Sequence, residues 1–507
     1  MSCHAIGDGG KLALGLQDLG SLSSPEKERS RFSNPMQTTP SRAAESQAMH
    51  PFSLVVTLMA SNSNNNAIDT PIIYDLAVVG RGMIGSAAAR HAAVLLLGQK
   101  AKEEVSVKIA LIGPSEDDST KEVYGAHYDE GRITRKTDPD PIWAELASRS
   151  IDRYPDISIG SSCSSFYQEC GHLAVSNTGS MVIQNRLDNL ERMKLTESSS
   201  IELLCDNQQL TERFPYLHFP DGCEGILEPK NAGYISARGL VDAQCQRAQE
   251  LGVDLINRVV ERIRPKDEHF ELRCSNGDVT IHAKKVLVAT GAFTNYRDLV
   301  PAQLDLTPIK TQTVHFLLDK ADATRLVSMP SIIFKDTKHW AYMLPPIRYP
   351  DGTIRLKLGG GTIMEDDDDD DDHDRRSMHS YQELVDWYNN KGGDAAATQE
   401  MTELLHRFVP NLSTTTMQVV VNTCATLHTP TRQAYVGEVL PGWAVATGGN
   451  GFAAKSSDEL GRLGALCVLD PEAFSQETIC GHPVAEVLKP LVVGETTGST
   501  ATNDKRH

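Results

Sequence analysis

The sequence predicts an α/β protein in which the first domain is interrupted by a second, mostly antiparallel β-sheet domain with helices. Residues Ile72 to Ile112 begin with an apolar, β-branched run, pass through a glycine-rich turn into a helix, and end in a second apolar run, as a βαβ unit does. Residues Ile309 to Leu358 contain four short runs of alternating apolar and polar side chains, which indicate antiparallel strands. A further strand and helix follow Gly442, so the first sheet is completed late in the chain.

The glycine-rich turn indicates a Rossmann-type dinucleotide site. Gly80, Gly82 and Gly85 have the G-x-G-x-x-G spacing directly between the first strand and its helix. The first glycine permits a tight turn, the second lets backbone N–H groups approach a pyrophosphate, and the third lets helix and strand pack closely. The phosphates would then lie at the positive end of the helix, beside Met83 and Ile84. A glycine-rich turn without a ligand is the alternative.

The end of the second strand departs from the usual dinucleotide pattern. That pattern places an acidic residue there to hold the ribose hydroxyls, whereas this chain has Gly113-Pro114. Either Glu116, Asp117 or Asp118 reaches back to the ribose, or backbone groups hold it.

Composition describes an ordinary globular protein with room for two or three domains, since the 507 residues are 40% hydrophobic and 23% charged. The net charge of -18 argues against nucleic acid or an anionic membrane as a partner. Part of it lies in one acidic loop, residues 365–374, which is expected to be solvated and not metal-binding. The 10 cysteines show neither disulfide nor metal spacing, and no apolar run is long enough to span a membrane. We expect no metal site and a cytoplasmic location.

The order of the segments predicts the domain division. Residues 1–70 are polar and without periodicity, so disorder is expected there. Two short strands are expected about Cys170-Gly171, and a hairpin is expected to turn at Asn276-Gly277. We expect a nucleotide-binding domain at 71–160, 232–305 and 418–475, a substrate domain at 161–231 and 306–417, and a tail at 476–507.

Several segments, taken together and in order, resemble the FAD-dependent amine oxidases of the D-amino-acid oxidase and glycine oxidase superfamily. They are GRGMIG, DEGRITR, KVLVATGAFTN, AYMLPP with LKLGGG, NTCATLHTPT and GGNGFAAKSSDELG. The resemblance covers about Tyr74 to Asp470 and is closest to the monomeric sarcosine oxidase and N-methyltryptophan oxidase branch. It implies FAD held between two domains. The flavin site would be completed by Thr290, Gly291, Gly449, Asn450, Gly451 and Phe452.

Two arginines of the DEGRITR segment match the family's arginines over the flavin. Arg132 would contact the cofactor, and Arg135 falls where the family binds the substrate carboxylate. A guanidinium suits a carboxylate because its planar fork matches both oxygens and its charge is permanent. The alternative is a surface ion pair with Asp129, Glu130 or Asp138.

The resemblance also assigns residues on the strands of the second domain. Lys357 matches the family's lysine beneath flavin N5, where a fixed cation favours electron transfer to O2. Strand periodicity places it on the face opposite Leu356 and Leu358. An edge-strand lysine facing water is the alternative. Tyr342 matches a tyrosine of the substrate pocket, with a core tyrosine as the alternative.

Cys424 matches the cysteine that carries the flavin through a thioether at its 8α carbon. Without the resemblance, a buried and inert thiol would be the ordinary expectation. The flanking TCATLHTPT segment favours the covalent link.

Other positions depart from the family. Its second anion-binding lysine follows Gly-x-Gly-Phe directly, but this chain has Ala453 there and Lys455 two residues later. Lys455 is kept as a substrate-binding candidate, although a helix begun at this point would turn it to another face. Gly361 replaces a pocket histidine and Thr426 a tyrosine, which disfavours sarcosine itself as the substrate.

These residues together predict an FAD-dependent oxidase of carboxylate-bearing amines: N-methyl, cyclic or primary amino acids. It would yield an imine, then a carbonyl product, together with hydrogen peroxide. The partners would be a small amine and O2, and the protein is expected to be a monomer. The alternatives are a flavin-dependent dehydrogenase that passes electrons to a protein or quinone, and a catalytically silent flavin-binding scaffold.

Overall fold

The computed structural model describes residues 72–100, 107–118, 122–158, 165–194, 201–275, 277, 279–362, 376–413 and 418–494. The predicted disorder of residues 1–70, the acidic loop 365–374 and Asn276 of the expected hairpin turn lie outside the described residues. Within this part of the chain, no helix combines the length and the apolarity needed to cross a membrane.

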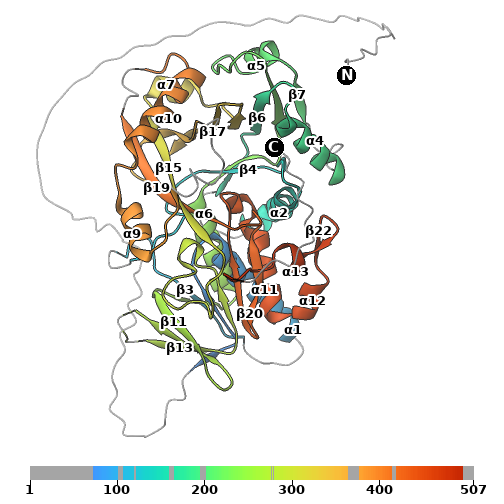
Figure 1. The fold of residues 1–507 in the computed structure, drawn as a ribbon, viewed down its shortest axis with the longest axis vertical. Coiled ribbons are helices and arrows are strands. Elements are labelled where there is room, and N and C mark those ends of the chain that lie inside the picture. The colour runs from blue at the N-terminus through green and yellow to red at the C-terminus, as the bar shows by residue number, and fades with distance from the viewer. Residues whose placement is uncertain are drawn as a thin grey trace, which may run out of the picture. The chain divides into compact units, whose positions relative to one another are not determined.

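A six-stranded sheet forms the centre of the α/β layer, as the sequence predicts (Figure 1). The strands are parallel except β20, which pairs antiparallel with β21. Their order is β10 (Asp254–Ile256), β3 (Ile109–Ile112), β2 (Leu76–Val79), β14 (Val286–Val288), β21 (Trp443–Thr447) and β20 (Tyr435–Leu440). Segments from the beginning, middle and end of the chain therefore lie side by side in one sheet.

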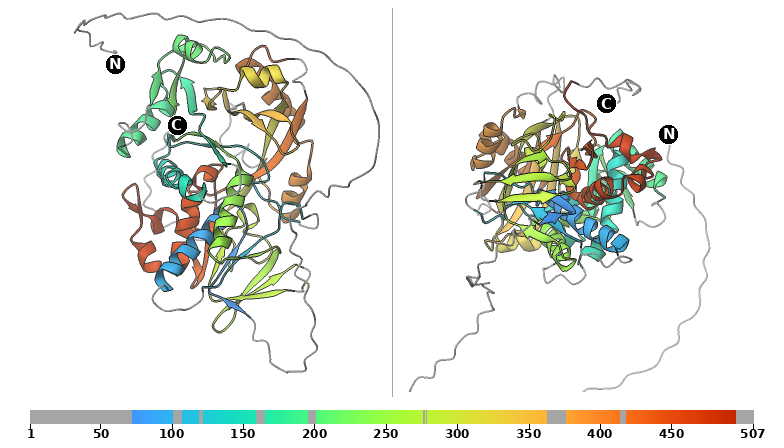
Figure 2. Two further views of the ribbon diagram at one scale, coloured as in Figure 1. Left: turned by 180° about the vertical axis from the view of Figure 1, so that it is seen from behind. Right: turned by 90° about the horizontal axis from the view of Figure 1, so that it is seen from below.

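One face of this sheet is covered by helices. Leu76 and Val78 of β2 point into this layer, where the helices pack on them. Helix α1 contacts both α6 and α11, and α2 packs on α11 (Figure 1 and Figure 2). The helices are α1 (Met83–Lys100), α2 (Pro141–Ile151), α6 (Ala237–Glu250) and α11 (Ser457–Leu469), and α3 (Tyr154–Ser158) contacts α6.

The opposite face is covered by a small four-stranded sheet. Ala77 and Val79 of β2 point to this side, because successive side chains of a strand alternate between its faces. The sheet has the order β1 (Ile73–Tyr74), β13 (Thr280–Ala283), β12 (Phe270–Cys274) and β11 (Val260–Pro265). Strands β12 and β13 are antiparallel, which confirms the predicted hairpin.

The second large sheet has eight strands and is antiparallel except where β16 lies parallel to β6. Its order is β19 (Val419–His428), β15 (Thr307–Leu317), β18 (Ile354–Thr362), β17 (His339–Arg348), β16 (Ser331–Lys335), β6 (His172–Asn177), β8 (Cys223–Glu228) and β7 (Glu202–Leu204). The predicted simple meander is wrong in one respect. Strand β15 does not neighbour β16, because it lies between β18 and β19 and pairs with β19 from Thr307 to Phe316.

Helices flank this sheet, and a small sheet lies near it. Helix α10 contacts β18 and β15, and α9 contacts β19. The three-stranded sheet has the order β4 (Arg132–Thr134), β9 (Gly233–Ile235) and β5 (Tyr167–Gln168), so the expected strands on either side of Cys170-Gly171 are β5 and β6. The helices are α4 (Met181–Arg192), α5 (Asn207–Arg213), α7 (Lys320–Arg325), α9 (Tyr381–Asn389) and α10 (Ala395–Phe408).

The prediction of a tail from residue 476 onward is wrong for residues 476–494. This segment follows α12 (Pro471–Ser475) and forms β22 (Thr478–Ile479), β23 (His482–Pro483) and α13 (Val484–Val487). Ile479, Val484 and Leu488 are fully buried in the helical layer's core. The segment folds onto the domain because it supplies apolar side chains to that core. The sequence does not reveal this, because these apolar residues are separated by short polar stretches.

Candidate active site

The turn after β2 has the geometry that the three glycines predict. Gly80 has φ +111°, and a Cβ on it would lie 2.3 Å from the carbonyl oxygen of Ala289. A Cβ on Gly85 would lie 1.8 Å from the Gly80 carbonyl oxygen, so α1 can approach the strand only with glycine there. By contrast, the nearest atom to a Cβ on Gly82 is His127 Nδ1 at 3.8 Å, which leaves the space over Gly82 open.

Helix α1 presents its amino-terminal end to this open space. The first N–H groups of a helix have no partner within it and carry partial positive charge. No acidic residue lies in the first turn of α1 to neutralise them. Met83 and Ile84 line the open space, so a phosphate group would fit there.

A cleft extends from this helix end to the eight-stranded sheet and encloses ≈ 1470 Å³ of empty space, its open mouth included. Its walls come from segments far apart in the sequence. Of the residues predicted to bind the cofactor, it is lined by Gly80, Gly82, Met83, Ile84, Arg132, Thr290, Gly291, Cys424, Gly449 and Gly451. Thr290 and Gly291 lie at the short helix η1 (Gly291–Phe293) that follows β14.

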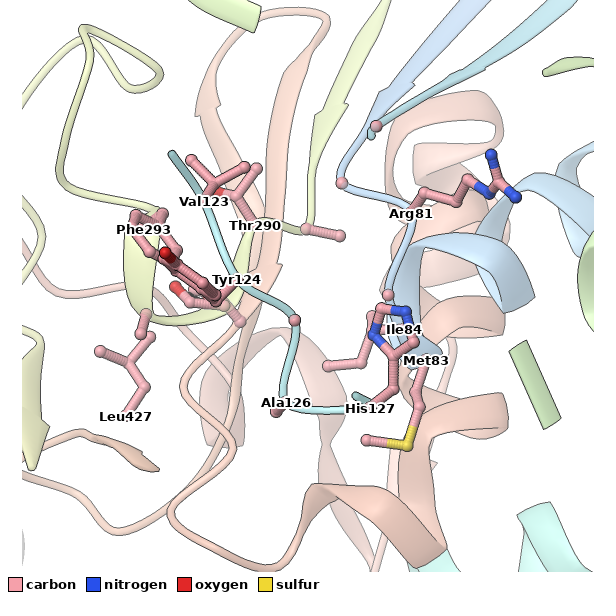
Figure 3. A pocket seen from close by; sticks show the side chains of 18 of the residues that line it. Arg81, Met83, Ile84, Val123, Tyr124, Ala126, His127, Thr290, Phe293 and Leu427 are labelled. Atoms are coloured by element: carbon pink, nitrogen blue, oxygen red, sulfur yellow. Dashed lines mark hydrogen bonds between the residues drawn. The ribbon is translucent and has the colours of Figure 1, made fainter. Parts of the chain in front are cut away.

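One segment of the cleft has no counterpart in the sequence predictions. Figure 3 shows the chain that bears Val123, Tyr124 and His127 crossing the cleft, with Phe293 on one side and Met83 on the other. The ring of Tyr124 stacks on that of Tyr388, with ring centres 5.0 Å apart, and its hydroxyl donates to Asn389 Oδ1 at 2.6 Å. Aromatic side chains therefore join this crossing segment to α9.

Three predicted cofactor residues do not line the cleft. Gly85 faces the strand, as described above. Asn450, at φ +48°, uses its side-chain oxygen to accept from the Thr429 N–H at 3.0 Å and its amide to donate to the Gly448 carbonyl at 2.7 Å. Phe452 packs on Trp143, with ring centres 5.7 Å apart. Asn450 and Phe452 thus stabilise the loop 448–452, which contains Gly449 and Gly451, and their side chains do not face the cleft.

The position of the missing ribose-binding acid is sterically closed. A Cβ on Gly113 would lie 2.6 Å from Arg81 Cβ and 2.7 Å from its backbone nitrogen, so no side chain fits there. The Glu116 carboxylate does not line the cleft; it accepts from Arg238 at 2.6 and 2.7 Å. These contacts favour backbone groups over Glu116 for holding a ribose.

Lys357 lies on the central strand β18, between β15 and β17, and is 1% exposed. The alternative of an edge-strand lysine in water is therefore wrong. Leu356 and Leu358 are buried in the core on the other face, as the alternation predicts. The Lys357 ammonium donates to Asp129 Oδ2 at 2.5 Å and to the carbonyl oxygens of Gly131 at 3.0 Å and Glu130 at 3.4 Å.

Asp129 is the centre of a buried cluster. Besides Lys357, it accepts from Arg132 Nη1 at 2.6 Å and from the Tyr349 hydroxyl at 3.1 Å, and His315 Nε2 lies 4.0 Å away. Arg132 also donates to the Ala126 carbonyl at 2.6 Å. The sequence suggested Asp129 only as a surface partner of an arginine. Its position three residues before Arg132 was the one available signal.

Burial and charge shift the pKa values in this cluster. Burial opposes ionisation of Asp129, but Lys357 and Arg132 outweigh it and hold the pKa of that carboxyl well below its usual range. Burial, with repulsion from Arg132, lowers the pKa of Lys357 to about 8 despite the attraction of Asp129. Burial lowers the pKa of His315 to about 3, so this imidazole is neutral at pH 7. Near pH 7 the cluster therefore holds two cations and one anion.

Tyr342 lies on β17, opposite Gly359 of β18. A Cβ on Gly359 would lie 2.5 Å from the Tyr342 ring, and a Cβ on Gly360 would lie 2.2 Å from the Trp340 carbonyl oxygen. These two glycines therefore make room for Tyr342 and for the neighbouring strand. Burial raises the pKa of Tyr342, so its hydroxyl is protonated at all working pH values.

Cys424 lies on β19, opposite Thr311 of β15, and its strand is separated from that of Lys357 only by β15. Its side chain is half-buried and lines the cleft. The Trp387 indole donates to the Cys424 carbonyl oxygen at 2.8 Å, and Tyr388 lines the same wall. A thiol in this position is open to a group in the cleft, unlike the buried thiols of Cys223, Cys245, Cys274 and Cys467.

Arg135 and Lys455, both predicted to bind the substrate carboxylate, meet on one protein carboxylate away from the cleft lining. Arg135 Nη2 donates to Asp138 Oδ2 at 2.9 Å, and Lys455 Nζ lies 3.1 Å from the same oxygen. Lys455 belongs to η3 (Ala453–Ser456), the helical turn before α11, which carries it to another face as the sequence suggested. The ion pair of Arg135 with Asp138 exists, but it is buried and not on the surface.

The chain belongs to the FAD dependent oxidoreductase (DAO) family, whose family model matches residues 75–465. Its cofactor is therefore FAD, and the residues of the cleft fit it: a helix end without acids, an open Gly82, and a groove that continues to Cys424. In the described part of the chain, no group of three or more His, Cys, Asp or Glu could hold a metal ion.

Comparisons with known proteins agree with this class. N-methyl-L-tryptophan oxidase of Shigella dysenteriae serotype 1 (strain Sd197) is 24% identical over 239 residues, which are 47% of this chain and 58% of the relative. This match thus spans little more than half of the relative's length. Among solved structures, NikD, an unusual amino acid oxidase essential for nikkomycin biosynthesis, has a TM-score of 0.62 at 18% identity and covers 84% of this chain and 98% of its own. L-proline dehydrogenase from P. horikoshii has a TM-score of 0.59 at 16% identity and covers 82% and 98%. At these identities the structural matches show the fold alone.

Proposed function

We propose that this chain is an FAD-dependent oxidase of secondary or primary amines that forms hydrogen peroxide. In the overall reaction, amine, O2 and water would give a carbonyl compound, a smaller amine or ammonia, and hydrogen peroxide, through an imine that water hydrolyses. The observation that carries the proposal is the buried Lys357–Asp129–Arg132 cluster, whose member Arg132 lines the same cleft as Cys424.

Bound FAD would supply the redox chemistry, accepting two electrons from the C–N unit of the amine and returning them to O2. The chain's own residues supply position and charge. The glycines after β2 and the start of α1 would hold the pyrophosphate of FAD, and Arg132 and Cys424 would hold the cofactor at the other end of the cleft. Tyr342, which like Lys357 is not among the residues that line the described cleft, keeps its hydroxyl protonated and would serve a substrate as a hydrogen-bond donor. No general base is required if the amine binds in its neutral form.

Lys357 would favour reduction of O2. A cation fixed in a buried site stabilises the negative charge that develops on oxygen, because the low dielectric strengthens the attraction. Asp129 neutralises one positive charge of the cluster, and Arg132 leaves a surplus of one. This surplus supports an oxidase.

A dehydrogenase that passes electrons to a protein or quinone is the second candidate. Three protein oxygen atoms accept hydrogen bonds from the Lys357 ammonium and so compete with O2 for its charge. This competition favours a dehydrogenase. The fold does not separate the two activities, because an L-proline dehydrogenase shares it.

An anaerobic screen of amines and amino acids, monitored by bleaching of the flavin absorbance, tests the proposal. The reduced protein is then mixed with O2 or with a quinone analogue, and peroxide is assayed. Rapid reoxidation by O2 with stoichiometric peroxide is expected. Slow reoxidation by O2 with rapid quinone reduction would identify a dehydrogenase, and a flavin that no amine bleaches would indicate a silent scaffold.

The resemblance adds two finer features. A carboxylate on the substrate would require Arg135 and Lys455, which here contact Asp138. A monomer is also expected, and size-exclusion chromatography with light scattering tests it.

A further inference from the structure

The buried group around Asp138 bears on the class of amine that the proposed oxidase would accept. Its carboxylate is fully used by the protein: Oδ2 is shared by Arg135 and Lys455, and Oδ1 accepts from the Asp140 N–H at 3.1 Å. Arg135 also donates from Nε to the Thr137 carbonyl at 2.8 Å, and Lys455 to the Phe452 carbonyl at 3.3 Å. Both cations therefore have protein partners, and both contact Asp138 Oδ2.

This group is closed to the cleft. Asp138 is 1%, Lys455 2% and Arg135 4% exposed, and none of them lines the cleft. A substrate carboxylate would have to displace Asp138 to reach the two cations. Displacement would leave a buried aspartate without its ion pairs, which is among the most costly changes in a protein interior.

The charges around this place require a carboxylate at position 138. Arg186, 2% exposed, donates to the Thr137 carbonyl at 2.9 Å and adds a third cation. Glu228 accepts from the N–H groups of Lys136 and Thr137 and from the Thr137 hydroxyl. Three cations thus face two carboxylates, and removing Asp138 would leave them facing Glu228 alone. A carboxylate at position 138 supplies the compensation that a substrate would otherwise bring.

The geometry points to Asp138 as a built-in counter-ion that occupies the pair of cations assigned by sequence to a substrate carboxylate. The amine substrate of this chain therefore carries no carboxylate beside the carbon that is oxidised. This inference rests on the proposed amine oxidation and concerns the specificity of the same site. Asp138 is a specificity-determining residue that acts through Arg135 and Lys455 and does not touch the reacting atoms.

Matched pairs of amines test the inference on the FAD-loaded, full-length protein. The pairs are piperidine with piperidine-2-carboxylate, and N-methylphenethylamine with N-methylphenylalanine, each tested anaerobically by the rate of flavin bleaching. The member without the carboxylate is expected to have the higher second-order rate constant, by about tenfold or more. A faster reaction of the carboxylated member in both pairs would overturn the inference.

A binding measurement separates this inference from the proposed reaction. Carboxylate ligands that cannot be oxidised, such as benzoate and 2-furoate, are titrated while the flavin spectrum is recorded. No saturable shift is expected in the wild type, and one is expected in Asp138→Asn, whose amide keeps the shape but frees the cations. A saturable shift in the wild type would overturn the inference even if no amine bleached the flavin, whereas absent bleaching alone would count against the oxidase.

Two further variants guard against a folding artefact. Asp138→Glu keeps the charge and is expected to leave the wild-type preference within about threefold. Asp156→Asn removes an exposed carboxylate from α3 and is expected to leave both binding and preference unchanged. If Asp138→Asn does not fold, the wild-type rates and titrations already decide.

Discussion

At the scale of single residues, Lys357 acts together with Asp129, whose carboxylate oxygen lies 2.5 Å from the ammonium nitrogen. The period-two pattern placed Lys357 opposite Leu356 and Leu358, and the structure agrees. Its partner Asp129 lies 228 positions earlier in the chain, and no local pattern could join the two. That partner decides how much charge Lys357 can offer to O2.

The first prediction concerns the charge of Lys357. Lys357→Met is expected to slow reoxidation by O2 about 100-fold and to leave anaerobic reduction within about threefold, because the cation acts on oxygen. The pKa of Lys357 is lowered to about 8, so the ammonium is charged below that pH and loses its proton above it. Wild-type reoxidation should therefore fall as pH rises through about 8, and the variant should show no such fall. Stopped-flow absorbance measures both steps.

The groups around Lys357 make this pH dependence interpretable. Asp129 stays ionised and Arg132 stays charged across the range, and His315 stays neutral. Lys335→Met, on β16 and exposed, is the matched control and should change neither rate nor profile. An unchanged reoxidation rate in Lys357→Met would remove the role assigned to this residue.

The second prediction concerns the covalent link. Cys424 is expected to form a thioether with the 8α carbon of FAD, a reaction that removes one hydrogen from each partner and passes two electrons to O2. Acid-precipitated wild-type protein should keep its yellow colour, and Cys424→Ala should release it to the supernatant. Cys170→Ser, at a half-buried cysteine outside the cleft lining, is the control and should retain the colour. Colour in the wild-type supernatant would rule out the link.

At the scale of elements, the strand–turn–helix unit of β2 and α1 was predicted well because its signals are local. Glycine spacing, an apolar strand and a small-residue helix lie within one stretch, and their steric reasons are visible at Gly80 and Gly85. The place of β15 could not be predicted in this way. Its partners β18 and β19 come from later segments, and alternation in a strand does not specify which neighbour it pairs with.

The third prediction tests that turn with two substitutions in the same helix. Gly85→Ala would place a Cβ 1.8 Å from the Gly80 carbonyl oxygen, so α1 must move away from the strand. We expect a loss of at least about 2 kcal/mol in the free energy of unfolding and weak or absent FAD binding. Urea unfolding and flavin content per protein measure these effects.

Gly98→Ala is the matched control, because a Cβ there meets no atom within 4 Å. Alanine in an exposed helical position is favoured over glycine by roughly 0.5–1 kcal/mol, so this variant should be unchanged or slightly more stable. Equal effects of the two substitutions would show that close packing at Gly85 is not what the turn requires.

At the scale of the whole molecule, the sequence predicted the fold class and the family but not which residues converge. The sequence predicted Lys357, Arg132 and Cys424 as separate site residues. In the structure, Lys357 and Cys424 lie on strands that are separated only by β15. Arg135 and Lys455 were also named, yet both contact Asp138, which no pattern singled out. Which side chains meet depends on tertiary packing. A motif therefore identifies a residue such as Arg135 but not the side chains that surround it.

The packing of residues 476–494 was likewise not evident from the sequence, and it leads to the last prediction. Leu488 follows α13 and is fully buried in the core that also holds α1 and α11, although its segment was expected to be a tail. Leu488→Ala should lower the free energy of unfolding by about 2–4 kcal/mol, because it leaves a cavity beneath the helices that cover the six-stranded sheet. Val493→Ala, at a side chain that is 57% exposed, should change it by less than about 0.5 kcal/mol. Urea unfolding of the FAD-loaded protein compares the two, and a Leu488 variant as stable as the Val493 variant would show that residues 476–494 are dispensable to the core.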